Sequence, residues 1–374
     1  MKHRFVLFFI CIIALSACAQ QTQSTVTADE PTEVNYDIEV VVPDLNIAWG
    51  MAFLPDGGML ITEKAGELLH FKDGETTTID GLPDVYLRGQ GGLMDVELHP
   101  DYENNGWIYI SHASEEGEED GGNTAIIRAR LNGTALTDVE QLYKAGPNSK
   151  RGQHFGSRIR FDDEGFMYFS IGDRGNRDVN PQDITRDCGK VYRLHDDGSI
   201  PESNPFVDNA DAKKAIFSYG HRNPQGMVKH PETGKIWVHE HGPRGGDEIN
   251  VVEKGKNYGW PVISYGINYD GTSFTDKTEM EGMEQPLFYW VPSIAPSGMD
   301  FVTSDKYPAW KGNLLVGSLK FEYIERLVIE NNVVTKREKL IEGEGRVRDV
   351  KQGPDGFIYA SLEGVGIVKI VPKS

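Results

Sequence analysis

The chain repeats one pattern six times. In each copy, alternating apolar residues lead into a turn of Pro, Asp, Gly or Asn, and a second apolar and aromatic stretch ends in small residues. Period-two alternation interrupted by turn residues predicts a β-hairpin. The spacing of roughly 45 to 70 residues leaves room for four strands per repeat and predicts an all-β fold, a six-bladed β-propeller with four-stranded antiparallel blades. The six copies begin at Met51, Val96, Ile159, Met227, Met299 and Val347.

A closed propeller ring needs a strand that joins its first and last blades. We expect residues 37–42 to pair with the last blade, which would leave few open strand edges. Two separate β domains are the alternative, but no linker-like stretch divides the middle of the chain. The sequence therefore predicts one propeller domain over residues 37–374. Its longer connections, around 113–123, 173–190 and 263–286, are expected to be insertions on one rim.

The N-terminal segment carries the pattern of an export signal. A basic start at residues 2–4 precedes an apolar run over residues 5–15 that is too short to span a membrane comfortably. The run ends in Leu-Ser-Ala-Cys, which resembles a bacterial lipobox; an ordinary signal-peptidase site is the alternative. We expect a lipoprotein signal peptide over residues 1–18 and a flexible tether over 19–36. The protein would then lie on the periplasmic side, anchored to the outer membrane only by lipid on Cys18.

Charge and cysteine content limit the partners and the covalent links. The formal net charge of -19 argues against nucleic acid as a partner. Any anionic ligand would need a local cluster of cations. Cys11 lies in the signal and Cys18 is the expected lipid site, so Cys188 is the one remaining thiol and no intrachain disulfide is expected.

Two candidate site residues stand just before predicted hairpin strands. Gln90 lies among glycines that would let a ligand approach the backbone closely, although a plain turn would look the same. His154 precedes the third hairpin, and histidine is the usual general base because its pKa lies near working pH. The alternative for His154 is a structural hydrogen-bonding role.

The segment from residue 218 to residue 261 holds the densest group of polar residues. Its Arg-Asn-Pro-Gln turn contributes Arg222, Asn223 and Gln225. A Gly-Pro turn and an acidic pair follow, and backbone carbonyls and carboxylates are the ligands that calcium prefers. The possible oxygen ligands are Gly242, Pro243, Asp247, Glu248 and Tyr258, with a solvated turn as the alternative for the acidic pair. His239 and His241 lack the third ligand that a zinc site would need.

Three cations lie near the last two hairpins. Lys320 closes the fifth hairpin, and Arg346 and Arg348 open the sixth. In so acidic a chain, cations that a propeller brings to one mouth indicate an anionic ligand. Pairing with surface carboxylates is the alternative.

Taken together, these motifs resemble the soluble quinoprotein aldose dehydrogenases, six-bladed propellers that use pyrroloquinoline quinone (PQQ) and calcium. The resemblance covers about residues 45–371, and Gly-His-Arg-Asn-Pro-Gln-Gly with the later Asn-Tyr-Gly-Trp-Pro are its most specific parts. It implies that His154 takes the proton of the anomeric hydroxyl while hydride passes to the quinone, and that Arg222 stabilises the developing charge. It assigns PQQ to Gln90, His154, Arg222, Asn223, Gln225, Lys320, Arg346 and Arg348.

The same resemblance implies two calcium positions. The carbonyls of Gly242 and Pro243 would hold the calcium that acts as a Lewis acid. Glu248 and Tyr258 match positions that carry a second calcium in some relatives. The glucose-specialised members carry an acid where this chain has Gln153, so a tolerant sugar pocket is expected.

The implied partners are aldose sugars and an external electron acceptor, either a periplasmic carrier or a quinone. Two other functions stay open. A calcium-dependent lactonase-like hydrolase would hold its metal with side-chain carboxylates and would not need the three cations. A non-catalytic sugar-binding propeller would not need His154 beside Arg222.

Overall fold

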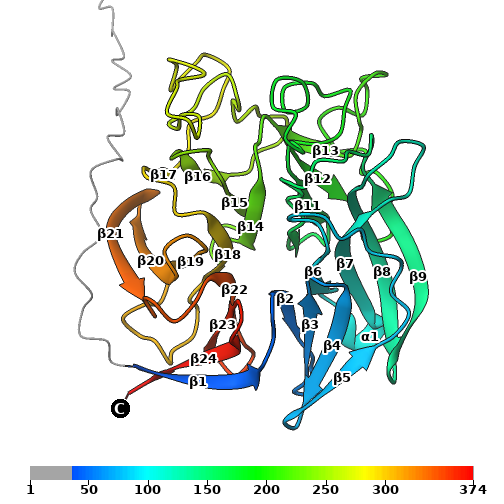
Figure 1. Cartoon of the computed structure of the whole chain (residues 1–374), viewed down its shortest axis with the longest axis vertical. Helices are drawn as coiled ribbons and strands as arrows, with labels where there is room; N and C mark the ends of the chain where they lie inside the picture. The colour runs from blue at the N-terminus through cyan, green and yellow to red at the C-terminus, as the bar shows by residue number, and fades with distance from the viewer. Residues whose placement is uncertain (1–35, 374) are drawn as a thin grey trace, which may run out of the picture.

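The computed structural model describes residues 36–373, which form six four-stranded antiparallel sheets (Figure 1). Blade 1 comprises β2 (Ala48–Phe53), β3 (Met59–Glu63), β4 (Glu67–Lys72) and β5 (Glu75–Ile79). Blade 2 comprises β6 (Leu93–Leu98), β7 (Trp107–Ser114), β8 (Asn123–Asn132) and β9 (Ala135–Lys144). Blade 3 comprises β10 (Ile159–Phe161), β11 (Met167–Ile171), β12 (Lys190–Leu194) and β13 (Ile216–Tyr219).

The second half of the chain continues the pattern. Blade 4 comprises β14 (Pro224–Lys229), β15 (Ile236–Glu240), β16 (Asp247–Val251) and β17 (Phe288–Trp290). Blade 5 comprises β18 (Pro296–Phe301), β19 (Leu314–Ser318), β20 (Tyr323–Glu330) and β21 (Val333–Leu340). Blade 6 comprises β22 (Val347–Gln352), β23 (Ile358–Leu362), β24 (Gly366–Pro372) and β1 (Tyr36–Pro43). The predicted six-bladed propeller is confirmed, and each of the six predicted hairpins forms the first two strands of a blade.

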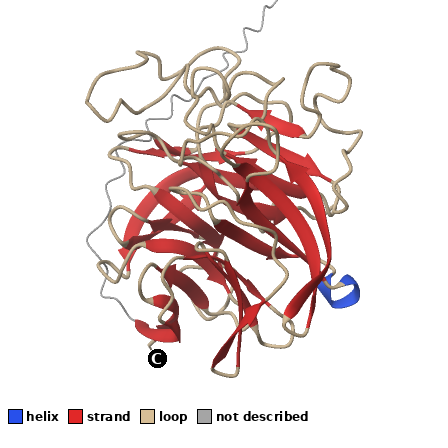
Figure 2. Cartoon of the chain, turned by 45° about the vertical axis from the view of Figure 1, so that its right-hand side comes forward, coloured by secondary structure: helices blue, strands red, loops and turns tan. Residues whose placement is uncertain are grey.

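The first and last strands of the described chain close the ring. β1 pairs antiparallel with β24, with Tyr36 opposite Pro372 and Pro43 opposite Gly366. The prediction that residues 37–42 complete the last blade is therefore confirmed. One short helix, α1 (Tyr102–Asn105), lies at the edge of the described part of the molecule (Figure 2). Within residues 36–373, no helix has the length and apolar character needed to cross a membrane.

Apolar packing between neighbouring sheets holds the blades together. The first strand of each blade contacts the first strand of the next, all the way round from β2 to β22 and back. Six clusters of buried apolar residues lie between successive blades; the one between blades 1 and 2, for example, joins Leu60 and Leu68 to Val96 and Ile108. Each blade packs between two neighbours, so inner strands such as β3, β11 and β15 are buried along their whole length.

Irregularities in the first strands turn certain side chains toward the centre. The pairing of β14 with β15 shifts register between Pro224 and Gly226, and the pairing of β22 with β23 shifts between Val347 and Asp349. Such a β-bulge inserts an extra residue and re-aims its side chain. The inserted residues are Gln225 and Arg348, and the Arg348 guanidinium donates to the Gln225 side-chain oxygen at 3.3 Å.

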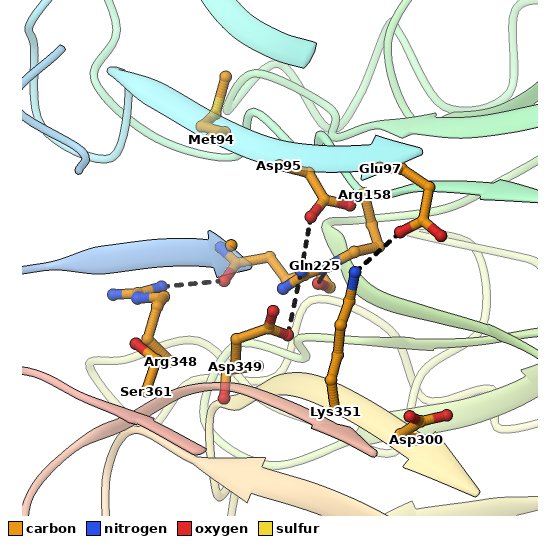
Figure 3. Close-up of polar contacts among 12 residues, drawn as sticks. Met94, Asp95, Glu97, Arg158, Gln225, Asp300, Arg348, Asp349, Lys351 and Ser361 are labelled. Atoms are coloured by element: carbon orange, nitrogen blue, oxygen red, sulfur yellow. Dashed lines mark hydrogen bonds and ion pairs between the residues drawn. The ribbon is translucent and has the colours of Figure 1, made fainter. Parts of the chain in front are cut away.

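Ion pairs among the first strands cross the centre of the ring (Figure 3). The buried Arg158 guanidinium contacts Asp95 of β6 at 3.0 Å and Asp349 of β22 at 3.1 Å, and it donates to the Gln225 carbonyl of β14 at 3.0 Å. One side chain thus links three other blades. The other charged residues of this group are Glu97, Arg160, Asp300 and Lys351.

The long connections gather on one side of the ring, at the top of Figure 1. The segments after β7 and β11 meet where Arg174 donates to the Gly122 carbonyl at 3.1 Å. The segments after β11 and β16 meet where Arg177 donates to the Asn268 side chain at 2.8 Å. The prediction that the three insertions share one rim is confirmed. We call this side the loop face.

Candidate active site

His154 lies in a cavity of about 400 Å³ on the loop face. Its side chain is 14% exposed, so most of the imidazole is shielded while one side meets the cavity. The residues lining the cavity come from blades 2, 3 and 4 and from two of the insertions. They are Gln90, Gln153, His154, Asp173, Gly175, Arg177, Asp178, Arg222, Pro243, Trp260, Asn268 and Tyr269.

A buried carboxylate orients the His154 ring. His154 Nδ1 lies 2.6 Å from Asp173 Oδ1, and Trp260 Nε1 donates to Asp173 Oδ2 at 2.9 Å. Burial alone would raise the pKa of Asp173, but the hydrogen bond and charge of His154, the charge of Arg222 and the Trp260 bond hold it below its usual value. With Nδ1 bound to a carboxylate, Nε2 is the ring nitrogen left to face the cavity.

The charge state of His154 suits a base. Burial, followed by the positive charge of Arg222, lowers the pKa of His154, and the Asp173 carboxylate only partly offsets these effects. The imidazole is therefore neutral at pH 7 and able to accept a proton.

Arg222 is fixed beside this imidazole by backbone oxygens. Its Nη1 donates to the carbonyls of His241 at 3.0 Å and Gly242 at 2.9 Å, and its backbone N–H donates to Glu240 at 2.5 Å. The guanidinium carbon lies 5.3 Å from the centre of the Trp260 ring. The two predicted catalytic residues, His154 and Arg222, are thus brought to one cavity.

Gln90 and Asn223 contact the segment that carries His154. The Gln90 side-chain oxygen accepts from the His154 backbone N–H at 2.7 Å, and the Asn223 side-chain oxygen accepts from Gly156 N–H at 3.1 Å. In both side chains the amide oxygen is thus already hydrogen-bonded to the backbone of this segment. The Asn223 Nδ2 is buried and has no partner among the described residues, although Asn223 does not itself line the cavity.

Two of the three predicted cations share one carboxylate. Arg346 and Arg348 both bind Glu363, Arg346 at 2.7 Å, and Arg346 also donates to the Leu319 carbonyl at 2.9 Å. Lys320, the neighbour of Leu319, is exposed and has no carboxylate partner within the described residues. Arg346 and Arg348 share a single acid and Lys320 has none among residues 36–373, so this cation cluster keeps a net positive charge, and Arg348 joins it to Gln225.

Glu248 and Tyr258 lie away from the cavity. The Tyr258 hydroxyl donates to the Val251 carbonyl at 2.6 Å and accepts from the Glu253 N–H at 2.9 Å. Glu248 lies opposite Glu240 in the pairing of β15 with β16, and the Asn250 amide donates to both carboxylates at 3.2 Å.

The idea of a solvated turn at Asp247 is wrong. Asp247 is fully buried in β16, and its carboxylate accepts the backbone N–H groups of Gly242, Ile294 and Ala295 at 2.7 to 3.0 Å. Three backbone donors replace water around this carboxylate. It therefore fixes the Gly242–Pro243 turn rather than facing solvent.

Sequence reasoning missed several residues of the site. Asp173 directly follows the second hairpin strand of blade 3, and that position on the loop face is the signal that could have identified it. Glu240 and Glu363 end or follow the second strands of blades 4 and 6 in the same way. The described residues hold no group of three or more His, Cys, Asp and Glu side chains arranged for a metal ion.

Comparison with known proteins identifies the family. The family model described as "Glucose / Sorbosone dehydrogenase" matches residues 45–367. The aldose sugar dehydrogenase YliI of Escherichia coli K12 is 40% identical over the full length of both chains. A crystal structure of the soluble aldose sugar dehydrogenase from E. coli, in the apo form, superimposes with a TM-score of 0.86 at 39% identity, covering 90% of this chain and 100% of the other.

A third relative shares the fold at lower identity. The PQQ-bound form of aldose sugar dehydrogenase from Streptomyces coelicolor has a TM-score of 0.72 at 24% identity, covering 91% of this chain and 99% of the other. The chain belongs to the glucose/sorbosone dehydrogenase family.

Proposed function

We propose that this protein oxidises the anomeric hydroxyl of aldose sugars to lactones, with PQQ and calcium as cofactors and His154 as general base. The main support is the neutral His154 imidazole, held by Asp173 and lying in a cavity beside the fixed charge of Arg222. When bound, PQQ supplies the hydride acceptor and calcium supplies a Lewis acid.

The residues present fit an anionic, planar cofactor. The unpaired Asn223 amide is a buried donor that needs a partner, and the Lys320, Arg346 and Arg348 cluster has more positive charge than Glu363 neutralises. Guanidinium groups suit carboxylates because they bind them with two parallel hydrogen bonds. Gln90 and Gln225 would add side-chain hydrogen bonds.

The donor sets also fit calcium. The Gly242 carbonyl oxygen accepts a hydrogen bond from the Arg222 cation, so it is aimed at positive charge. Pro243, the next residue in this rigid turn, offers a second carbonyl oxygen. Burial, followed by the charge of Glu240, raises the pKa of Glu248 to about 8, and a divalent cation would relieve this repulsion. The Asn250 side-chain oxygen is buried there without a partner. We assign Glu248 to a second calcium on these grounds, and Tyr258 to the same calcium on the family resemblance alone.

The chain's own residues then have distinct tasks. His154 Nε2 takes the proton of the anomeric hydroxyl, and Asp173 stabilises the imidazolium that results. Arg222 provides a fixed positive charge where negative charge develops, which lowers the barrier because the group needs no reorganisation. Trp260 and the insertions wall the cavity and limit water.

The direct test is reconstitution. Purified protein supplied with PQQ and Ca²⁺ is expected to reduce an artificial dye when given aldoses, and omission of either cofactor should abolish the reaction. Release of a lactone would be followed in the same samples. A protein that hydrolyses a lactone with calcium alone, and reduces no dye, would instead be the lactonase-like hydrolase.

The pH profile gives a second expected result. Since His154 acts in its neutral form, kcat/KM should be constant around pH 7 and fall as the pH drops through the pKa of His154, with a midpoint below the ordinary 6.5. Asp173→Asn removes the carboxylate that raises this pKa, so its midpoint should lie lower still and its kcat should fall. A midpoint above 6.5 in the unaltered protein would contradict the assignment.

The proposed location rests on the N-terminal sequence, and the proposed electron acceptor rests on the family resemblance. Residues 1–35 lie outside the described part of the chain, so the signal peptide, the tether and the lipid on Cys18 stand on the sequence alone. We propose an exported, lipid-anchored enzyme on the periplasmic side that passes electrons to a soluble carrier or a quinone.

A further inference from the structure

The backbone at His154 adopts a conformation that side-chain-bearing residues rarely hold. Its φ is +59°, in the left-handed region, and the nearby Ser157 has a φ of +86°. A non-glycine residue is disfavoured there because its Cβ crowds the backbone. Such a conformation persists only where the surrounding structure holds it. The position of the His154 ring therefore depends on what fixes the flanking peptides.

Arg174 holds the segment on both sides of His154. Its Nη1 donates to the Gln153 carbonyl, and its Nη2 donates to the Arg151 carbonyl at 2.8 Å. Its guanidinium carbon lies 3.4 Å from the centre of the Phe155 ring. The residues before and after His154 are thus bound by one side chain.

Within residues 36–373 no carboxylate forms an ion pair with the Arg174 guanidinium, although the charge of Asp173 acts on it. Arg174 is 1% exposed, and its remaining hydrogen bond goes to the Gly122 carbonyl at 3.1 Å. Burial lowers the pKa of Arg174 to about 10, so the group remains charged at pH 7. A buried cation bound only by backbone carbonyls is costly, which argues for a specific role.

Asp173, the residue before Arg174, also restrains His154. Asp173 binds the His154 ring, while Arg174 binds the backbone around it, so two adjacent residues control one imidazole. Gly175 N–H donates to Asp173 Oδ1 at 2.7 Å, which ties the two residues into one tight turn.

We propose that Arg174 is a positioning residue that sets the left-handed backbone of His154 and thereby aims Nε2 into the cavity. The role rests on the proposed function of His154 as the base. Its chemistry calls for arginine, because a planar fork with several N–H donors reaches two carbonyls while its face stacks on a ring. Lysine keeps the charge but cannot reproduce this fork.

The test compares Arg174→Lys with a matched change, Arg193→Lys, in the full chain. Arg193 is also buried in blade 3, stacks near Phe166 and Phe217, and hydrogen-bonds Asn204 at 2.8 Å, but does not line the cavity. Arg174→Lys should lower kcat about a hundredfold with KM nearly unchanged, because small displacements of a catalytic group cost that much. Arg193→Lys should leave kcat unchanged.

A second readout needs no turnover. Amide hydrogen exchange across residues 152–156, measured without cofactor, should speed up in Arg174→Lys and not in Arg193→Lys. Arg174→Gln gives the same comparison if the lysine variant fails to fold. Unchanged exchange and unchanged kcat in a folded Arg174 variant would overturn the proposal. If the unaltered protein oxidises no sugar, the proposed function fails, while the exchange result still decides whether Arg174 positions His154.

Discussion

His154→Ala should reduce sugar-dependent dye reduction by about a thousandfold, within the range that a positioned general base contributes. The variant keeps Arg222 and the cation cluster, so binding of PQQ should be retained. The loss would therefore fall on kcat, because the proton of the anomeric hydroxyl has no acceptor. The measurement is kcat for one aldose with saturating PQQ, Ca²⁺ and dye.

His195→Ala provides the control for that experiment. His195 is exposed, contacts the Phe166 ring and lies outside the cavity, so its removal should leave kcat unchanged. A His154→Ala protein that binds PQQ and retains kcat within a factor of about ten would show that His154 is not the base, since even a weak general base contributes more.

Arg158→Met should destabilise the protein by roughly 3–5 kcal/mol, the usual cost of breaking a buried ion pair by removing one partner. Arg158 contacts both Asp95 and Asp349, and both carboxylates are fully buried (Figure 3). Methionine fills similar volume, but it leaves Asp349 without its direct partner. Equilibrium unfolding in denaturant measures the change in the free energy of unfolding.

Lys72→Met is the matched control on the surface. Lys72 pairs with Asp56 at 2.6 Å, and both side chains are largely exposed. Exposed pairs contribute little to stability because water screens them. If Arg158→Met costs no more than Lys72→Met, the central ion pairs do not hold the blades together.

Much of the fold could be predicted because it repeats. Each hairpin shows the same alternation, and each alternating face packs against the next blade, so six copies give the architecture directly. Pairing of β1 with β24 followed from the need to close the ring. The bulge at Arg348 could not be predicted, because no turn residue or break in the alternation marks the extra residue. The bulge at Gln225 lies between Pro224 and Gly226, and these two residues could have signalled it.

Only some residues of the candidate site could be predicted from the sequence. His154, Arg222, Gln90 and Pro243 stood out by their positions beside turns and predicted strands, the family resemblance then implied their roles, and they do line one cavity. Asp173 was missed because its importance lies in the distance to His154, which depends on how blade 3 folds. From the sequence, pairing of Arg346 and Arg348 with surface carboxylates was the alternative to ligand binding. In the structure both pair with Glu363, in a partly buried cluster with excess positive charge.

The most direct test of a sugar-oxidising quinoprotein is one pair of absorption spectra. The protein is reconstituted with stoichiometric PQQ and Ca²⁺, and a spectrum is recorded before and after an aldose is added in the absence of dye. We expect the spectrum to change from that of the oxidised to that of the reduced cofactor, and dye to restore it. If PQQ binds stoichiometrically but no aldose alters its spectrum, the protein is not a sugar-oxidising quinoprotein.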